Sequence, residues 1–101
     1  MTSKQRAYLR GLANTLESKY QYGKGEISEN FVAQIDSALE ANELIKISVL
    51  ETAPLSPREL CDELCRLLGA DGVQVIGSKV VIYRESKKNK RIVLPNAKKG
   101  S

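Results

Sequence analysis

Apolar residues recur with two different periods along this chain, and the order of these periods restricts the fold more than any other feature. Between residues 28 and 42 they return every three or four positions, as in a helix with one buried face, whereas residues 44–50 alternate as in a strand. The same patterns mark helices at 3–14 and 57–68 and strands at 20–22, 73–76 and 79–83. The predicted order is therefore α-β-α-β-α-β-β, which is typical of an α/β fold.

Short polar motifs predict where the helices begin and end. Thr2 opens a capping box before the first helix, and Ser28 is the expected N-cap of the second. The second helix should end near Asn42, because asparagine tolerates the left-handed backbone found at helix C-termini. The third helix has the clearest start, with a serine cap, a proline and a glutamate at residues 56–59, and Gly69 ends it.

These elements predict a single domain built on a mixed four-stranded sheet. Strand-helix-strand units joined by right-handed crossovers are followed by a hairpin at Gly77-Ser78. A chain of 101 residues supports one core. We predict that the domain covers residues 1–95, with 92–95 docked as an extended segment, and that 96–101 form a basic flexible tail. The third helix should bury Leu60, Cys61, Leu64, Leu67 and Leu68, and the second should expose Asp36, Glu40 and Glu43.

Charge is distributed unevenly along the chain. Residues 1–25 hold five lysines and arginines against one glutamate, residues 26–71 hold three against ten acids, and residues 72–101 hold eight against one. Two basic ends around an acidic middle are the pattern expected if the ends fold together into one positive surface. The alternative is that both ends are simply solvated, and the charges alone do not distinguish the two.

Little in the sequence supports catalysis or metal binding. There is no histidine, and Cys61 and Cys65 lie one helical turn apart among leucines, which indicates reduced thiols in the core and not part of a zinc site. Glu59, Asp62 and Glu63 form an acidic helix face that is typical of a solvated surface. We therefore expect a protein that is not an enzyme and that needs no metal or other cofactor.

The sequence also bears on where the protein acts. No apolar run approaches the ~20 residues that span a bilayer. The polar amino terminus lacks the apolar core of an export signal. We expect a cytoplasmic monomer that does not bind membranes.

A glycine loop, Gly23-Lys24-Gly25-Glu26, separates the first strand from the helix capped by Ser28. The first turn of a helix has backbone N–H groups without helical partners and carries a positive partial charge, which favours an anion. Glycine lets the backbone approach that anion closely, and Lys24 adds a mobile positive charge. The arrangement suits a phosphate, but such loops are common and have little specificity alone.

Basic residues from both ends are the remaining binding candidates. Because the first helix leads through the first strand into the glycine loop, we expect their cations to be neighbours, joined by Arg84 if the last strand ends on that side. Tyr8, Tyr22 and Tyr83 are potential base-stacking residues, although tyrosines more often pack half-buried. The predicted RNA-binding residues are Lys4, Arg6, Arg10, Lys19, Gly23, Lys24, Gly25, Ser28, Arg84, Lys87, Lys88, Lys90 and Arg91.

Several short motifs together give the chain a resemblance to the CRM domain family, in particular to its stand-alone bacterial YhbY-like members. The motifs occur in one order and spacing, KQRAYLRGLA at 4–13, the loop at 23–25, ELIK at 43–46, VQVIG at 73–77 and Tyr83-Arg84. The resemblance extends from Lys4 to Pro95. It implies a fold similar to the C-terminal domain of translation initiation factor 3, RNA binding, and association with large-subunit ribosomal precursors in ribosome assembly.

The chain departs from the family pattern in the loop. Family members usually carry G-x-x-G there, comparable in shape to the loop with which KH domains clamp an RNA backbone, whereas Glu26 occupies the fourth position here. A carboxylate at that point is expected to weaken phosphate binding unless it turns to solvent. Our first hypothesis is a non-catalytic protein that binds ribosomal RNA. The alternatives are a protein-interaction adaptor with an incidental basic surface and a DNA-binding protein.

Overall fold

The computed structural model describes residues 1–25, 27–88 and 90–95. It confirms the predicted order of elements, and β3 begins two residues earlier than predicted. The predicted tail over 96–101 lies outside the described residues. The elements are α1 (Ser3–Ala13), β1 (Tyr20–Tyr22), α2 (Glu29–Asn42), β2 (Leu44–Val49), α3 (Pro57–Leu68), β3 (Asp71–Ile76) and β4 (Lys79–Tyr83).

The four strands form one mixed sheet in the order β1-β2-β4-β3. β1 and β2 are parallel and are connected by α2, whereas β4 lies antiparallel between β2 and β3. Leu44 lies opposite Tyr83 at one end of the β2–β4 ladder, and Ser48 lies opposite Lys79 at the other. The predicted mixed four-stranded α/β fold is confirmed.

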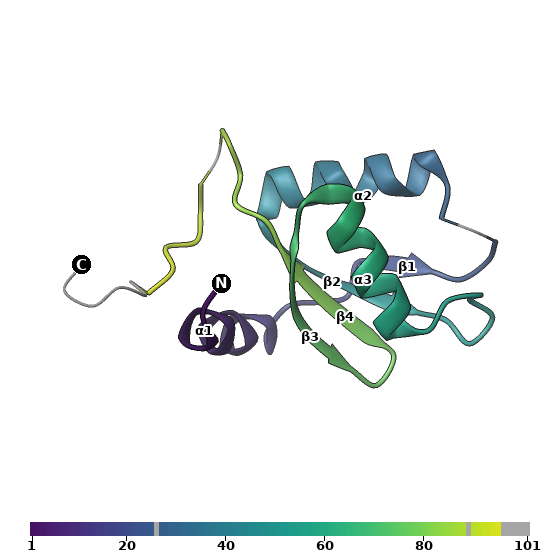
Figure 1. The fold of residues 1–101 in the computed structure, drawn as a ribbon, viewed down its shortest axis with the longest axis horizontal. Helices are drawn as coiled ribbons and strands as arrows, with labels where there is room; N and C mark the ends of the chain where they lie inside the picture. The colour runs from purple at the N-terminus through teal and green to yellow at the C-terminus, as the bar shows by residue number, and fades with distance from the viewer. Residues whose placement is uncertain (26, 89, 96–101) are drawn as a thin grey trace.

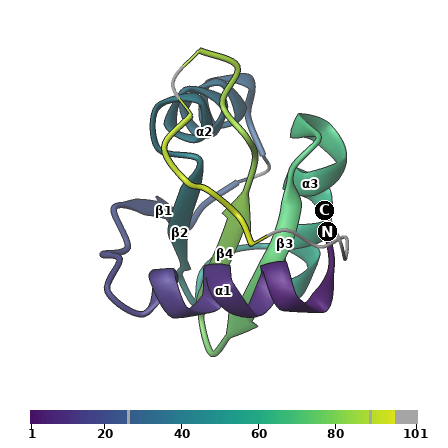
Figure 2. The same ribbon diagram turned by 90° about the vertical axis from the view of Figure 1, so that its left-hand side faces the viewer.

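Helices cover both faces of this sheet, so the domain has two apolar clusters (Figure 1). α2 and α3 pack on one face, where Ile35, Leu60 and Ile47 are fully buried. α1 lies across the strands on the other face (Figure 2), where Leu9 and Val81 are fully buried. Because residues alternate along β2 and β4, each strand supplies side chains to both clusters.

The segment after β4 returns to α1. Ile92 and Leu94 pack against the cluster under α1, and the Gln5 side chain donates a hydrogen bond to the Pro95 carbonyl at 3.2 Å. The predicted docking of 92–95 against the domain is therefore confirmed.

The helix ends follow the predicted motifs with one correction. Thr2, Ser28 and Ser56 are N-caps, and Gly69 ends α3 in the left-handed conformation. α2 ends at Asn42 as predicted, but the residue with positive φ is Glu43, at 68°. Glu43 is fully buried, so its predicted place on the exposed acidic face of the helix is wrong. Its carboxylate is buried because it binds backbone N–H groups of a distant segment.

The last turn of α3 gives a second correction. Leu60, Cys61 and Leu64 are buried as predicted, whereas Leu67 is 44% exposed. Leu67 lines a hollow beside α2 together with Leu68, which is half-buried against the core. The apolar stripe of α3 therefore continues beyond the buried core into a partly open hollow.

The two cysteines are free, with Cys61 buried and Cys65 half-buried. The Cys61 thiol and burial both raise the pKa of Cys65, so this thiol remains protonated at neutral pH. Within the described ranges, no group of three or more cysteines, aspartates or glutamates could hold a metal ion. A search of the same ranges finds no helix with the length and apolar character needed to cross a bilayer.

Candidate nucleic-acid interface

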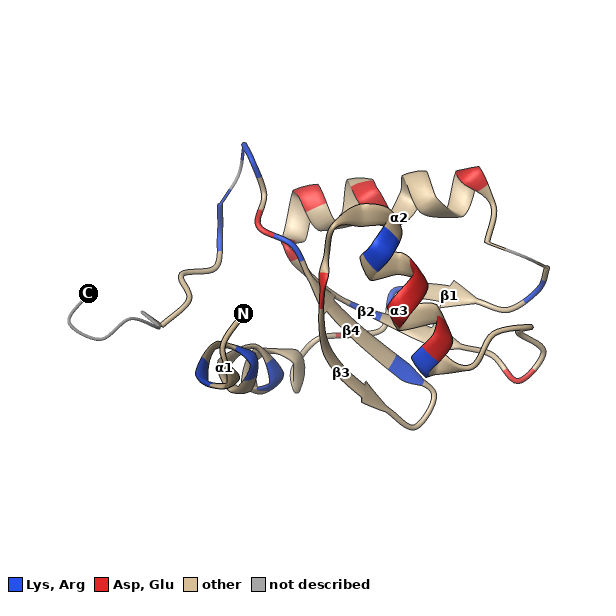
Figure 3. Cartoon of the chain, viewed as in Figure 1, with Lys and Arg blue, Asp and Glu red and all other residues tan. Residues whose placement is uncertain are grey.

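The helices on opposite faces of the sheet differ in charge, because α1 carries only cations and α2 only acids, whereas α3 carries both (Figure 3). α1 carries three cations and no acid. Lys46 and Lys79 lie on the same face of the sheet as α1, because their neighbours along β2 and β4 enter the core under α2 and α3. We call Lys4, Arg6, Arg10, Lys46 and Lys79 the α1 surface. On the other face, α2 and α3 carry Glu29, Asp36, Glu40, Glu59, Asp62 and Glu63.

Two of the three cations on α1 are exposed. Lys4 and Arg10 point to solvent, whereas Arg6 is half-buried and donates from Nε to the Gly72 carbonyl at 3.0 Å. Arg6 therefore helps to fix α1 against β3. None of the three forms an ion pair with a described acid. Their charges remain available to a polyanion.

The predicted stacking tyrosines have different environments. Tyr22 and Tyr83 are buried in the two apolar clusters, so they cannot stack on a base in this structure. Tyr8 is 43% exposed on α1, four positions from Lys4 and therefore on the same side of the helix. Tyr8 is the stacking candidate that the structure retains.

A polar row on the sheet, which was not among the predicted binding residues, extends the α1 surface. Gln21, Ser48 and Lys79 lie side by side on neighbouring strands. The Lys79 ammonium donates to the Ser48 hydroxyl at 2.8 Å, and the Ser18 hydroxyl lies 2.5 Å from the same oxygen. The signal was present, because alternation along residues 44–50 places Lys46 and Ser48 opposite the predicted buried face.

The two basic ends of the chain meet at one hollow beside α1. The hollow lies between the end of α1, the start of β2 and the C-terminal segment, and Lys19, Lys46 and Arg91 all line it. Glu17 and Asn42 also line it. Of the basic residues expected to converge, Lys19 from the first end and Arg91 from the second therefore meet here.

The glycine loop is held by hydrogen bonds within the domain. The Tyr22 hydroxyl donates to the Gly25 carbonyl at 3.0 Å, and the Thr52 hydroxyl donates to the Gly23 carbonyl at 2.8 Å. The Ser28 hydroxyl accepts from the backbone of α2. Lys24 is exposed between the two glycines. The predicted effect of Glu26 concerns a position outside the described residues.

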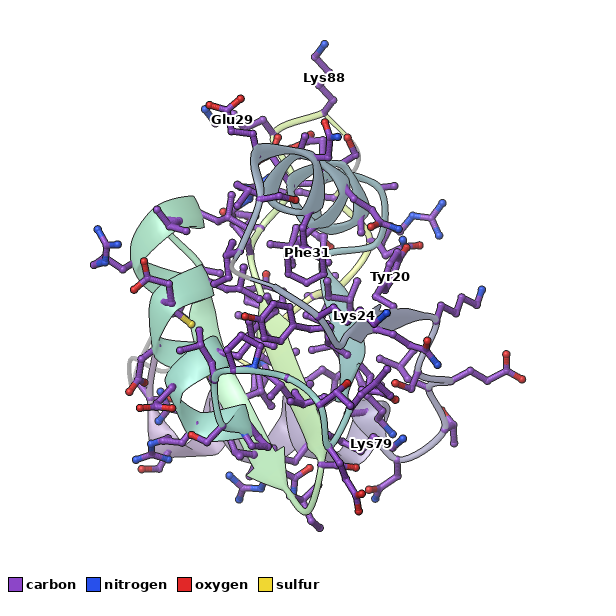
Figure 4. The ribbon with its side chains drawn as sticks, turned by 90° about the vertical axis from the view of Figure 1, so that its right-hand side faces the viewer. Tyr20, Lys24, Glu29, Phe31, Lys79 and Lys88 are labelled. Atoms are coloured by element: carbon purple, nitrogen blue, oxygen red, sulfur yellow. The ribbon has the colours of Figure 1, made fainter. Side chains whose placement is uncertain are left out.

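The prediction that Lys24 and Arg84 join the α1 surface is wrong. α1 and the loop after β1 lie towards opposite ends of the long axis in Figure 1, because the chain runs away from α1 as it passes through β1. Figure 4 looks onto the end that carries Lys24 and shows Lys88 beside α2 at the top of the view and Lys79 towards the bottom. Arg84 binds Asp36 at 2.7 Å and the Leu68 carbonyl at 3.1 Å, so it joins α2 to α3 on the opposite face.

Glu40 in α2 and Glu43 at its C-cap hold the basic segment after β4, a contact that no sequence motif predicted. Glu43 accepts the backbone N–H groups of Ser86, Arg91 and Ile92, each at 2.7 Å. Glu40 accepts the Ser86 hydroxyl at 2.7 Å and the backbone N–H groups of Lys87 and Lys88 at 3.1 Å. The Lys87 and Lys88 side chains are exposed, and Lys90 pairs with Glu85 at 2.8 Å. We call Glu40 and Glu43 the carboxylate clamp.

We predict that acid loosens this clamp. Hydrogen bonds, first that of the Ser86 hydroxyl, lower the pKa of Glu40. Burial acts to raise the pKa of Glu43, but its three backbone donors outweigh burial and lower it. Both carboxylates therefore contribute stability above their ordinary pKa of 4.5, and this contribution is lost as the pH falls through the lowered values.

The measurement is the amide proton shifts of Ser86 and Ile92, followed by NMR from about pH 6 to about pH 3. We expect both shifts to change together below the ordinary carboxyl pKa. The Glu43→Gln variant should lack the step at Ile92. Shifts that stay constant throughout this range would contradict the role of the clamp.

We predict that Gly25→Ala lowers the free energy of unfolding by about 1 kcal/mol, because Gly25 has φ of 68° and alanine is strained there. No neighbouring atom would contact the added methyl group, so the cost comes from the backbone alone. Gly11→Ala is the matched control, because Gly11 lies in α1 with open space around it and should gain roughly 0.5–1 kcal/mol. Urea denaturation of both variants measures the difference, and equal effects of the same sign would refute it.

Fold and surface together define a small α/β domain with one cationic face. The CRS1 / YhbY (CRM) domain model matches residues 1–84. The chain belongs to the CRS1/YhbY (CRM) domain family, as the resemblance of its motifs predicted.

Named relatives cover nearly the whole chain. This chain is 42% identical over 95 residues to the "Probable RNA-binding protein YqeI" of Bacillus subtilis, and the match covers 94% of this chain and 99% of that protein. It is 34% identical over 95 residues to an "RNA-binding protein" of Haemophilus influenzae, and this match covers 94% of this chain and 95% of that protein. The solution structure of the hypothetical protein SAV1595 from Staphylococcus aureus shares 47% identity and a TM-score of 0.70, covering 94% and 99%. The fold described above is therefore also found in a solved relative.

Proposed function

We propose that this protein binds RNA through the α1 surface and does not catalyse a reaction. The observation that carries the proposal is the charge of α1, which has three cations, no acid, and two exposed side chains without an ion pair to the described acids. Such a helix gains affinity for a polyanion, because each phosphate that it neutralises releases counterions. The names of the relatives support RNA as that polyanion.

The neighbours of α1 favour RNA over an unspecific polyanion. Tyr8 offers an exposed ring on which an unstacked base can lie, and Gln21 offers an amide to a base edge or a 2′-hydroxyl. The hollow lined by Lys19, Lys46 and Arg91 has a volume of about 590 Å³, which is in the range of ligand pockets, and can take a phosphate together with its sugar. A folded RNA would contact the helix and the hollow at once.

The proposed target is ribosomal RNA in precursors of the large subunit, and the proposed role is in ribosome assembly. This finer proposal rests on the resemblance to the stand-alone YhbY-like members of the family. The protein would act as a cytoplasmic monomer. Crosslinking in cells followed by sequencing of the attached RNA tests it, and we expect large-subunit ribosomal sequences to be enriched. Enrichment of unrelated messenger or transfer RNA would refute the ribosomal target and leave RNA binding intact.

A protein-interaction adaptor is the second candidate, because on the face opposite α1 the helix α2 carries only acids and Leu67 of α3 is exposed (Figure 3). Affinity purification with and without ribonuclease distinguishes the two candidates. RNA that is recovered with the protein, and partners that are lost after ribonuclease, would support RNA binding. Partners that resist ribonuclease, with no RNA recovered, would refute it. Competition between structured RNA and duplex DNA for the purified protein tests the DNA-binding alternative.

A further inference from the structure

A second surface, on the opposite face of the sheet, has a chemistry that does not suit a nucleic acid. Two hollows lie along α3, one beside the loop before it and one between α2 and α3, and they share Ile27 and Glu63. Because these two residues line both hollows, the surface is continuous. We call it the α2–α3 groove.

The floor of the α2–α3 groove is apolar and exposed. Leu67 is 44% exposed, and the adjoining side chains of Ile27 and Leu55 are half-buried. An exposed leucine alone requires no explanation. Here it belongs to a row of apolar residues in a depression, which is the usual form of a protein-binding groove. The apolar lining consists of Tyr22, Ile27, Val32, Ala33, Pro54, Leu55, Leu67 and Leu68.

The rim of the groove is acidic, and its described lining contains no lysine or arginine. The acids are Glu29, Asp36, Glu59, Asp62 and Glu63. Two of them are partly neutralised, since Arg84 pairs with Asp36 and Arg66 pairs with Glu63. The other three form no ion pair with a described cation. A ligand that enters the groove therefore meets negative charge on both sides.

We propose that the α2–α3 groove binds a basic, amphipathic helical segment of a partner protein. Apolar side chains of that segment would pack on Leu67, Ile27 and Leu55, and its lysines and arginines would face Glu29 and Asp62. A helix that lays one apolar face into a groove is a common mode of peptide recognition. RNA is repelled from this surface by the same acids. The proposal does not depend on RNA binding, although a protein that used both faces would join an RNA to a basic protein.

The test uses the full chain and a fluorescent synthetic peptide, an amphipathic helix of leucine and lysine, with a peptide of the same composition in scrambled order as a control. Fluorescence anisotropy measures the affinity. We expect the amphipathic peptide to bind in a saturable manner and the scrambled one to bind at least about tenfold more weakly, because only the first presents one apolar face.

Two groove variants and one control locate the binding. Leu67→Ser removes an exposed apolar contact, and Glu29→Lys combined with Asp62→Lys reverses the rim charge; each should weaken the peptide about tenfold or more. Glu17→Lys combined with Glu51→Lys changes the net charge by the same amount outside the groove and should have a much smaller effect. All five substituted side chains are exposed, so the variants should fold like the wild type. Urea denaturation checks this.

Several results would overturn the proposal. The first is that the wild-type protein does not bind the amphipathic peptide. The second is that the groove variants and the control variant lose peptide affinity equally, because this would indicate attraction by net charge alone. Self-association in sedimentation equilibrium that Leu67→Ser abolishes would assign the groove to a second copy of the chain. Loss of RNA affinity in the groove variants would assign this face to RNA.

Discussion

Replacing Glu43 with alanine is expected to lower the free energy of unfolding by about 3 kcal/mol, because three backbone N–H groups lose a charged acceptor. Glu43 is fully buried, and the donors of Ser86, Arg91 and Ile92 all lie 2.7 Å from its carboxylate oxygens. An unsatisfied buried donor costs about 1–3 kcal/mol, and this figure is reduced where water can reach the freed segment. Urea denaturation measures the loss, and amide exchange at Ile92 should report release of the segment.

Two further substitutions distinguish the contribution of the Glu43 carboxylate to stability from that of its backbone conformation. Glu43 has φ of 68°, a backbone conformation that glutamate and alanine rarely adopt and that strains both. Glu43→Gly relieves that strain and still removes the acceptor, so it should be less damaging than alanine by about 1 kcal/mol. Glu43→Gln keeps one oxygen for Arg91 and Ile92 but presents an amide donor to Ser86, and should fall between wild type and alanine. A Glu43→Ala variant within about 0.5 kcal/mol of wild type would contradict the clamp.

The sequence predicted those parts of the fold that local chemistry determines. Ser56 and Thr2 cap their helices because the side-chain oxygen of each accepts a hydrogen bond from the backbone N–H three residues later. This contact is local and does not depend on where the helix packs. Period-two alternation placed Ile45 and Ile47 on one face of β2, and the same arithmetic would have placed Lys46 on the face of α1. Both depend only on short sequence separations, so no tertiary information was needed.

Contacts between distant segments could not be predicted in this way. Glu43 and Ser86 are 43 residues apart, and no local motif indicates that a glutamate after a helix will bind a later backbone. The separation of Lys24 from Arg10 has a similar origin. Elements adjacent in the chain were expected to remain neighbours, whereas α1 and α2 pack on opposite faces of the sheet. Arg84 was taken as a free cation because Asp36, its partner, lies 48 residues earlier.

The Lys4→Ala, Arg10→Ala double variant is expected to lower RNA affinity by roughly tenfold at moderate salt and to reduce the slope of log K against log salt by about 1.4–1.8, which corresponds to two phosphate contacts. Both side chains are exposed on α1, so the variant should keep the stability of the wild type in urea. The measurement is fluorescence anisotropy with a structured RNA fragment over a range of salt concentrations.

A matched control removes the same charge from the other face. The Arg58→Ala, Arg66→Ala variant also loses two cations, but from α3, and should change the slope much less. Equal slopes in the two double variants would mean that net charge and not the α1 surface determines binding.

Lys24→Ala tests the glycine loop separately, because Lys24 lies at the end of the molecule far from α1. It should reduce the slope by roughly 0.7–0.9 if Lys24 contacts one phosphate. If Lys24→Ala alone changes the slope, the interface is the loop and the α1 proposal fails, whereas changes in both place one RNA along the whole length of the domain.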